Sequence, residues 1–199
     1  GLLFVGGVLA WLAEILDPHL PRAVAMGSVL LTLLVMLFLL GAEAGPGGWL
    51  AVVDVSWLPR FGIHFYLAVD GLSLLLILLT VFLGAIAVAS AWDEIKDRAG
   101  FFYFNLLWTL AGVLGVFLAL DLFLFFFFWE VMLIPMYFII AIWGHENKNY
   151  AAMKFFIFTQ VSGLLMLVSI LVLAYFHYLQ FDEFRICHEN SRVLKAAGR

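Results

Sequence analysis

Glu130 is the residue whose type and surroundings most directly suggest chemistry. It lies in the middle of Asp121–Gly144, a segment whose other interior residues are all apolar or aromatic. A carboxylate at the centre of a membrane helix costs roughly 2.5–3.5 kcal/mol on insertion scales, so such residues usually mark functional sites. Burial favours the neutral carboxyl and a nearby cation favours the carboxylate, so Glu130 is predicted to transfer protons. The alternative is a purely structural hydrogen bond between helices.

Lys154 is the basic residue nearest to this segment in a neighbouring apolar stretch. At 1.5 Å per residue, Glu130 lies about 21 Å from Gly144 along its helix, whereas Lys154 lies about 6 Å from Tyr150. The axial gap of roughly 15 Å excludes a direct ion pair between the two side chains. Lys154 is therefore a secondary candidate for proton transfer, through water or a further helix, and its long side chain is also placed to reach the membrane surface.

Three further residues have predicted structural roles. Asp70 and Asp121 each precede an apolar stretch, where a carboxylate can cap a helix N-terminus. Pro135, five residues after Glu130, cannot donate a backbone hydrogen bond and so leaves the carbonyl of Val131 unpaired beside the candidate site. A carbonyl freed in this way can hold water at membrane depth.

The composition identifies the chain as a membrane protein. Of its 199 residues, 66% are hydrophobic and only 12% are charged, compared with about 45–50% and about 25% in ordinary globular chains. The net charge of −4 suggests no nucleic-acid partner. A single cysteine, Cys187, excludes an internal disulfide framework, and no metal-binding motif accompanies it. We therefore expect no metal and no cofactor on this polypeptide.

The apolar stretches predict an all-α membrane protein with about six transmembrane helices, because about 20 apolar residues cross a bilayer. Leu2–Ala13 is short and resembles the end of a span that the sequence enters part-way. The other predicted spans are Ala23–Ala42, Gly71–Trp92, Ala99–Leu120, Leu122–Trp143 and Phe155–Phe176. The regions are then 1–42 for two helices, 43–70 for a loop outside the membrane, 71–178 for four helices, and 179–199 for a polar tail, which is either an extracytoplasmic loop or non-native sequence.

Within the loop, Gly45 to Gly48 should break a helix, and two short runs, Leu50–Trp57 and Gly62–Val69, flank Pro59-Arg60. These runs predict a β-hairpin, with an irregular loop as the alternative. Lys and Arg concentrate on the other side of the membrane, in the loops that hold Arg22, Lys96, Arg98, Lys148 and Lys154. Because basic loops face the cytoplasm, the first residue and the hairpin are expected to be extracytoplasmic.

The segment Asp121–Phe138 (DLFLFFFFWEVMLIPMYF) resembles the fifth transmembrane helix of subunit M of proton-pumping NADH–quinone oxidoreductase, respiratory complex I. Trp57–Ile63 (WLPRFGI), Asp70–Leu74 (DGLSL) and Lys154–Gln160 (KFFIFTQ) resemble other parts of the same subunit, in the same order. The tail from about Phe181 does not resemble the expected continuation.

The resemblance implies an antiporter-like fourteen-helix subunit, of which this chain would be an N-terminal fragment lacking the later helices of the channel. It implies that Glu130 is a proton-handling residue and that Lys154 is a family position of less certain role. It also implies membership of an enzyme, a translocase, whose NADH, FMN, iron–sulfur clusters and quinone belong to partner subunits. The expected partners are other membrane subunits of complex I and the lipid bilayer. The alternatives are a subunit of a multi-subunit sodium/proton antiporter or membrane-bound hydrogenase, and an inactive truncated scaffold.

Overall fold

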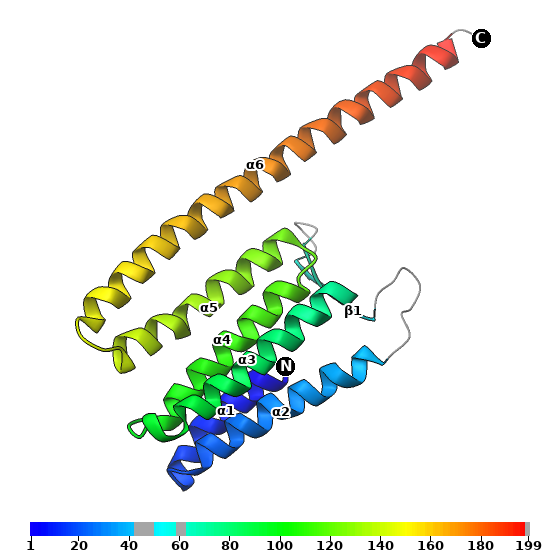
Figure 1. The fold of residues 1–199 in the computed structure, drawn as a ribbon. Coiled ribbons are helices and arrows are strands. Elements are labelled where there is room, and N and C mark those ends of the chain that lie inside the picture. Colours follow the sequence, from blue (N-terminus) through cyan, green and yellow to red (C-terminus); the bar gives the residue numbers. More distant parts are fainter. Residues whose placement is uncertain (42–49, 59–62, 198–199) are drawn as a thin grey trace. The chain divides into compact units, whose positions relative to one another are not determined.

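The computed structural model describes residues 1–41, 50–58 and 63–197. The elements of this part follow one another as shown in Figure 1. In chain order they are α1 (Leu2–Leu16), α2 (Leu20–Leu40), β1 (Ala51–Leu58), β2 (Ile63–Val69), α3 (Gly71–Glu94), α4 (Ala99–Leu118), α5 (Leu122–Trp143) and α6 (Lys148–Ala197).

The predicted membrane spans are confirmed. Within the described residues, α2, α3, α4, α5 and the part of α6 from Lys148 to His177 are each long and apolar enough to cross a bilayer. The predicted span Leu122–Trp143 coincides with α5, and the ends of α2, α3 and α4 lie within a few residues of the predicted ones. At 15 residues α1 is shorter than a full span, as its short apolar stretch suggested.

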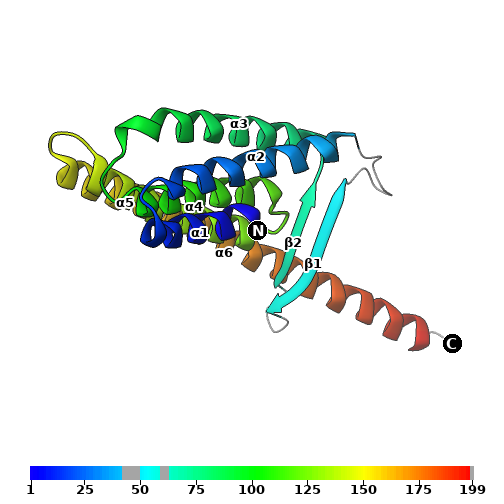
Figure 2. The same ribbon diagram turned by 90° about the horizontal axis from the view of Figure 1, so that it is seen from below.

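Helices α1 to α5 lie side by side in both views (Figures 1 and 2). The central helix is α4, which contacts α1, α2, α3 and α5. Its apolar window is 44% buried, compared with 17% for that of α2. Short turns join α1 to α2, α3 to α4 and α4 to α5, so these consecutive helices run in opposite directions. The bundle therefore holds α5 against a helix that is itself enclosed on several sides.

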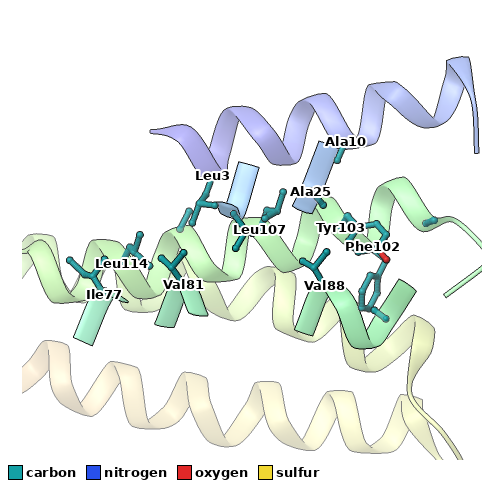
Figure 3. Close-up of a cluster of buried hydrophobic side chains, with 14 residues drawn as sticks. Leu3, Ala10, Ala25, Ile77, Val81, Val88, Phe102, Tyr103, Leu107 and Leu114 are labelled. Carbon is teal, nitrogen blue, oxygen red and sulfur yellow. The ribbon is translucent and has the colours of Figure 1, made fainter. Parts of the chain in front are cut away.

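The core of the bundle lies along α4 (Figure 3). Tyr103 and Leu107 of α4 are fully buried there. They belong to a cluster that also includes Leu3 and Ala10 of α1, Ala25 and Val29 of α2, and Ile77, Val81 and Val88 of α3. Burial of these apolar side chains against one another sets the positions of the helices.

The two strands pair in antiparallel fashion, with Ala51 opposite Val69 and Val55 opposite Phe65. The register shifts between Ser56 and Leu58. An isolated bridge joins Leu67 of β2 to Ala119, in the turn between α4 and α5. This bridge ties the strands to the start of α5. The predicted helix break at 45–48 and the predicted turn at Pro59-Arg60 lie outside the described residues.

Residues Gly1–Gln160 form one compact unit, and the chain from Val161 onward forms a second. The second unit consists of the continuation of α6, whose helical backbone extends to Ala197. The apolar part of α6 ends at His177, close to the predicted end of the last span at Phe176. The helix continues into the polar tail because no proline interrupts Lys148–Ala197.

Candidate functional site

The N-terminal cap of α5 fixes the start of the helix that carries Glu130. The carboxylate of Asp121 accepts hydrogen bonds from the backbone N–H groups of Phe123 (2.7 Å) and Leu124 (3.1 Å). These bonds satisfy two of the donors that a helix N-terminus leaves unpaired. From this cap α5 runs without interruption through Pro135 to Trp143, so Glu130 lies near its midpoint.

Glu130 is half-buried, and its two carboxylate oxygens have different surroundings. The side-chain amide of Gln160, on α6, donates from Nε2 to Oε2 of Glu130 over 3.0 Å. The other oxygen, Oε1, is buried and has no hydrogen-bond partner among the described residues. A buried oxygen without a partner carries a desolvation cost, which a hydrogen bond from a water would relieve.

A cavity of about 300 Å³ adjoins this carboxylate. Most of its wall is apolar and comes from α5 and α6, including Phe123, Phe126, Phe127 and Phe156. The polar wall groups are the side chains of Glu130 and Gln160. A buried water needs about two to four polar partners, which these two groups can begin to supply.

Pro135 is buried within α5. Because proline has no N–H, the carbonyl of Val131 lacks the helix hydrogen bond that it would otherwise accept. Val131 itself lines the cavity beside Glu130. The proline therefore leaves a free backbone carbonyl at Val131, next to Glu130, while the helix remains continuous.

Lys154 lies apart from this site. Its side chain is exposed, and its Nζ lies over the ring of Tyr150, 5.7 Å from the ring centre. Both residues belong to the start of α6, and Lys154 lies about 9 Å along the helix from Lys148. Glu130 lies about 20 Å from the end of α5, so the two residues are at different depths, as the sequence indicated.

Asp70 caps α3. Its carboxylate accepts a hydrogen bond from the backbone N–H of Ser73 over 2.8 Å. Hydrogen bonds from the hydroxyl and the backbone N–H of Ser73 hold the pKa of the Asp70 carboxyl below its ordinary value of 3.8. Asp70 therefore fixes the point where the chain passes from β2 into α3.

Gln160 is the site residue that the charge-based search of the sequence missed. It lies 12 residues after Lys148, the first residue of α6, or about 18 Å along the helix. Glu130 lies 13 residues before Trp143, the last residue of α5, or about 20 Å along that helix. The two side chains thus reach the same depth, and the same calculation extended to neutral polar residues would have paired them.

No group of three or more His, Cys, Asp or Glu side chains that could hold a metal ion occurs in the described ranges. The candidate site consists of one carboxylate, one amide and an apolar cavity. Such groups can bind and pass on a proton, and they offer no ligand set for a cation of higher charge.

The described part of the chain is a bundle of membrane-length helices that carries a glutamate in the interior of α5. Residues 119–194, which contain α5 and most of α6, match the family described as NADH:quinone oxidoreductase/Mrp antiporter, TM. Over these residues, which include part of the polar tail, the chain is similar to this family.

The similarity to subunit M extends over most of the chain. NADH-quinone oxidoreductase subunit M of Escherichia coli (strain K12) is 50% identical over 187 residues, covering 88% of this chain and 37% of that protein. The subunit M of Pseudomonas aeruginosa is 51% identical over 189 residues, covering 88% of this chain and 37% of the relative. The chain thus spans a little over a third of the length of these relatives.

A solved structure also resembles this chain. Respiratory complex I from Thermus thermophilus with bound NADH contains a chain that superposes with a TM-score of 0.74 at 30% sequence identity. The match covers 85% of this chain and 34% of that one. The fold of the membrane bundle is therefore that of an antiporter-like subunit.

Proposed function

We propose that this chain contributes to proton translocation in an NADH:quinone oxidoreductase, with Glu130 as the residue that takes up and releases the proton. One observation carries the proposal: Glu130 is held at mid-helix by Gln160 through one oxygen, while its other oxygen is buried without a described partner beside a cavity. An intramembrane carboxylate of this kind is expensive unless it serves a proton or ion pathway.

The proton-transfer step requires only that the environment of the carboxylate changes. A cation that approaches favours the carboxylate and releases the proton, and a cation that withdraws favours the neutral acid. Lys154 lies at a different depth from Glu130, so we propose that the cation acts through water or comes from a further helix of the assembled protein. Glu130 then holds the proton from the withdrawal of the cation until the cation approaches again.

The energy for this cycle is proposed to come from quinone reduction in partner subunits. NADH, FMN, iron–sulfur clusters and quinone are assigned to those subunits and not to this chain. The partners are the other membrane subunits of the complex and the lipids of a bacterial inner membrane, with the first residue on the extracytoplasmic side. The basic loops on the opposite side support this orientation.

The test is proton pumping and NADH–quinone turnover in membrane vesicles that carry the complex with the full-length form of this chain, with and without Glu130→Gln. We expect the variant complex to assemble and to lose both activities. Normal pumping by the Glu130→Gln complex would overturn the assignment of Glu130 and leave a structural role, in which the residue serves only as a helix-to-helix hydrogen bond.

A second candidate function is ion exchange in a multi-subunit sodium/proton antiporter, with a membrane-bound hydrogenase subunit as a related possibility. The description of the matched family names both NADH:quinone oxidoreductase and the Mrp antiporter, which favours keeping this alternative. Sodium flux in vesicles that contain neither NADH nor quinone would support the antiporter. Proton movement that depends on NADH oxidation would support the translocase.

A further inference from the structure

We propose that Gln160 is the positioning residue of the proton-transfer step: it holds Oε2 of Glu130, so that Oε1 alone exchanges the proton with water in the adjoining cavity. The inference rests on the proposed role of Glu130 and adds a second residue, from a different helix, to the same site. Gln160 acts through Glu130 and takes no proton itself.

The hydrogen bond gives the two oxygens separate tasks. An amide Nε2 can only donate, and here it donates to Oε2 over 3.0 Å. This bond fixes the rotation of the carboxyl group about its last torsion, which is otherwise broad and nearly two-fold. Oε1 then keeps one direction relative to α5, and it is the oxygen that is buried without a hydrogen-bond partner in the described chain.

The cavity provides the space that proton exchange needs. Its volume of about 300 Å³ exceeds the roughly 30 Å³ that one water occupies in the liquid. Among the side chains of its wall, those of Glu130 and Gln160 are the polar ones, so a water that enters can bond to these two groups. Gln160 therefore has two functions at this point: Nε2 orients the carboxylate, and the rest of its amide forms part of the polar surface that can hold the water.

The position of Gln160 on α6 makes the contact sensitive to helix packing. Phe156, one turn before Gln160, packs against the ring of Tyr137 of α5 with ring centres 5.7 Å apart. The hydroxyl of Tyr137 also lies 3.9 Å from the sulfur of Met153. These contacts hold the first turns of α6 against α5. The amide of Gln160 and the carboxylate of Glu130 therefore lie at the same depth and can meet.

The experiment uses the assembled complex with the full-length form of the chain and compares four versions: the parent, Glu130→Gln, Gln160→Met and Thr159→Val. Gln160→Met keeps the length of the side chain and removes the donor. Thr159→Val is the matched control, because Thr159 is also half-buried and its hydroxyl bonds to the carbonyl of Phe155 in its own helix. Gln160→Asn, whose amide ends one methylene short, is a second variant in case the methionine complex does not assemble.

Two quantities are measured: the rate of NADH-driven proton pumping, and the infrared carbonyl stretch of the protonated Glu130 carboxyl, identified as the band that disappears in Glu130→Gln. Losing the amide should slow pumping about tenfold, since misplacing a reacting group by about 1 Å can cost up to about a hundredfold. The band should move to higher frequency in Gln160→Met and Gln160→Asn, because the carbonyl loses a hydrogen bond. Thr159→Val should leave both quantities at the parental values.

The outcomes separate this inference from the proposed function. If Glu130→Gln abolishes pumping but Gln160→Met leaves the band and the pumping rate unchanged, the positioning role of Gln160 is wrong and the role of Glu130 stands. If Glu130→Gln pumps normally, or removes no carbonyl band at any pH, the proposed function itself fails. A slower Gln160→Met complex with an unshifted band would assign Gln160 to helix packing and would also overturn the inference.

Discussion

Gln160 and Glu130 come from different helices and are 30 positions apart in the sequence, yet the Nε2 atom of one lies 3.0 Å from the Oε2 atom of the other. The amide leaves Oε1 of the glutamate buried without a partner in the described structure. A bond to one oxygen of a carboxylate makes the two oxygens inequivalent, which a water-filled pocket or a symmetric ion pair would not do. Several measurements can test what this asymmetry does.

Glu130→Asp keeps the carboxyl group but withdraws it by one methylene. The shorter side chain no longer reaches Nε2 of Gln160, so the carboxyl remains titratable but loses its orientation. We expect a pumping rate between those of the parent and of Glu130→Gln, measured in vesicles containing the assembled complex. Parental activity in Glu130→Asp would indicate that the position of the carboxyl relative to α6 is unimportant.

Lys154→Met tests whether the lysine belongs to the proton path. Lys154 is exposed and lies over the ring of Tyr150, away from Glu130. Because Lys154 and Glu130 differ by roughly 11 Å in depth along their helices, removing this charge should leave the pumping rate within about twofold of the parental rate. Lys154→Arg serves as the control that keeps the charge. A loss in Lys154→Met as large as that in Glu130→Gln would place the lysine in the path despite its distance.

The sequence was sufficient to locate the membrane helices and the interior carboxylate. A stretch of about 20 apolar residues has few alternatives to a spanning helix, because every backbone polar group in lipid must be satisfied internally. Glu130 stood out for a similar reason, since an ionisable residue in such a stretch is rare and costly. These two predictions depend on large free energies, and neither requires knowledge of how the helices pack.

The partner of Glu130 depended on weaker effects. Gln160 is neutral, and neutral polar side chains are common in membrane helices because they can bond within their own helix or to a neighbour. Thr159 bonds within its own helix, whereas Gln160 bonds to the neighbouring helix α5, although the two residues are adjacent in the sequence. Which of the two faces α5 follows from the rotation of α6, and that rotation is set by packing contacts such as the one between Tyr137 and Phe156.

Asp70 provides a test of pH dependence outside the membrane-spanning segments. Hydrogen bonds from Ser73 hold the pKa of its carboxyl below 3.8, so the folded form binds its proton less tightly than the unfolded form does. The cap therefore contributes fully above the unfolded pKa, and its contribution is lost as the pH falls through the lower, folded value.

We expect the amides of Ser73 and Leu74 to exchange faster, relative to Asp70→Asn, as the pH falls toward about 3. The asparagine keeps a capping oxygen of comparable quality but cannot be protonated in this range. Hydrogen exchange followed by mass spectrometry, with both proteins compared at each pH, removes the intrinsic pH dependence of exchange. If the ratio of the exchange rates of the parent and Asp70→Asn stays constant from neutral pH to about pH 3, the cap is not supported.

Gly115→Ala tests the contact that holds α5 in place. A Cβ atom at Gly115 of α4 would overlap the ring of Phe128, two residues before Glu130 on α5. Overpacking of this kind typically costs about 1–3 kcal/mol, because the ring or the helix must shift.

The control is Gly27→Ala in α2, where a Cβ would meet nothing within 4 Å. Thermal unfolding of the purified complex should show a lower midpoint for Gly115→Ala and an unchanged or slightly higher one for Gly27→Ala, since alanine favours helices. Pumping should fall in Gly115→Ala as well, because a shift of Phe128 moves the adjoining carboxylate away from Gln160. Equal midpoints for the two variants would show that α4 and α5 do not approach each other closely at this point.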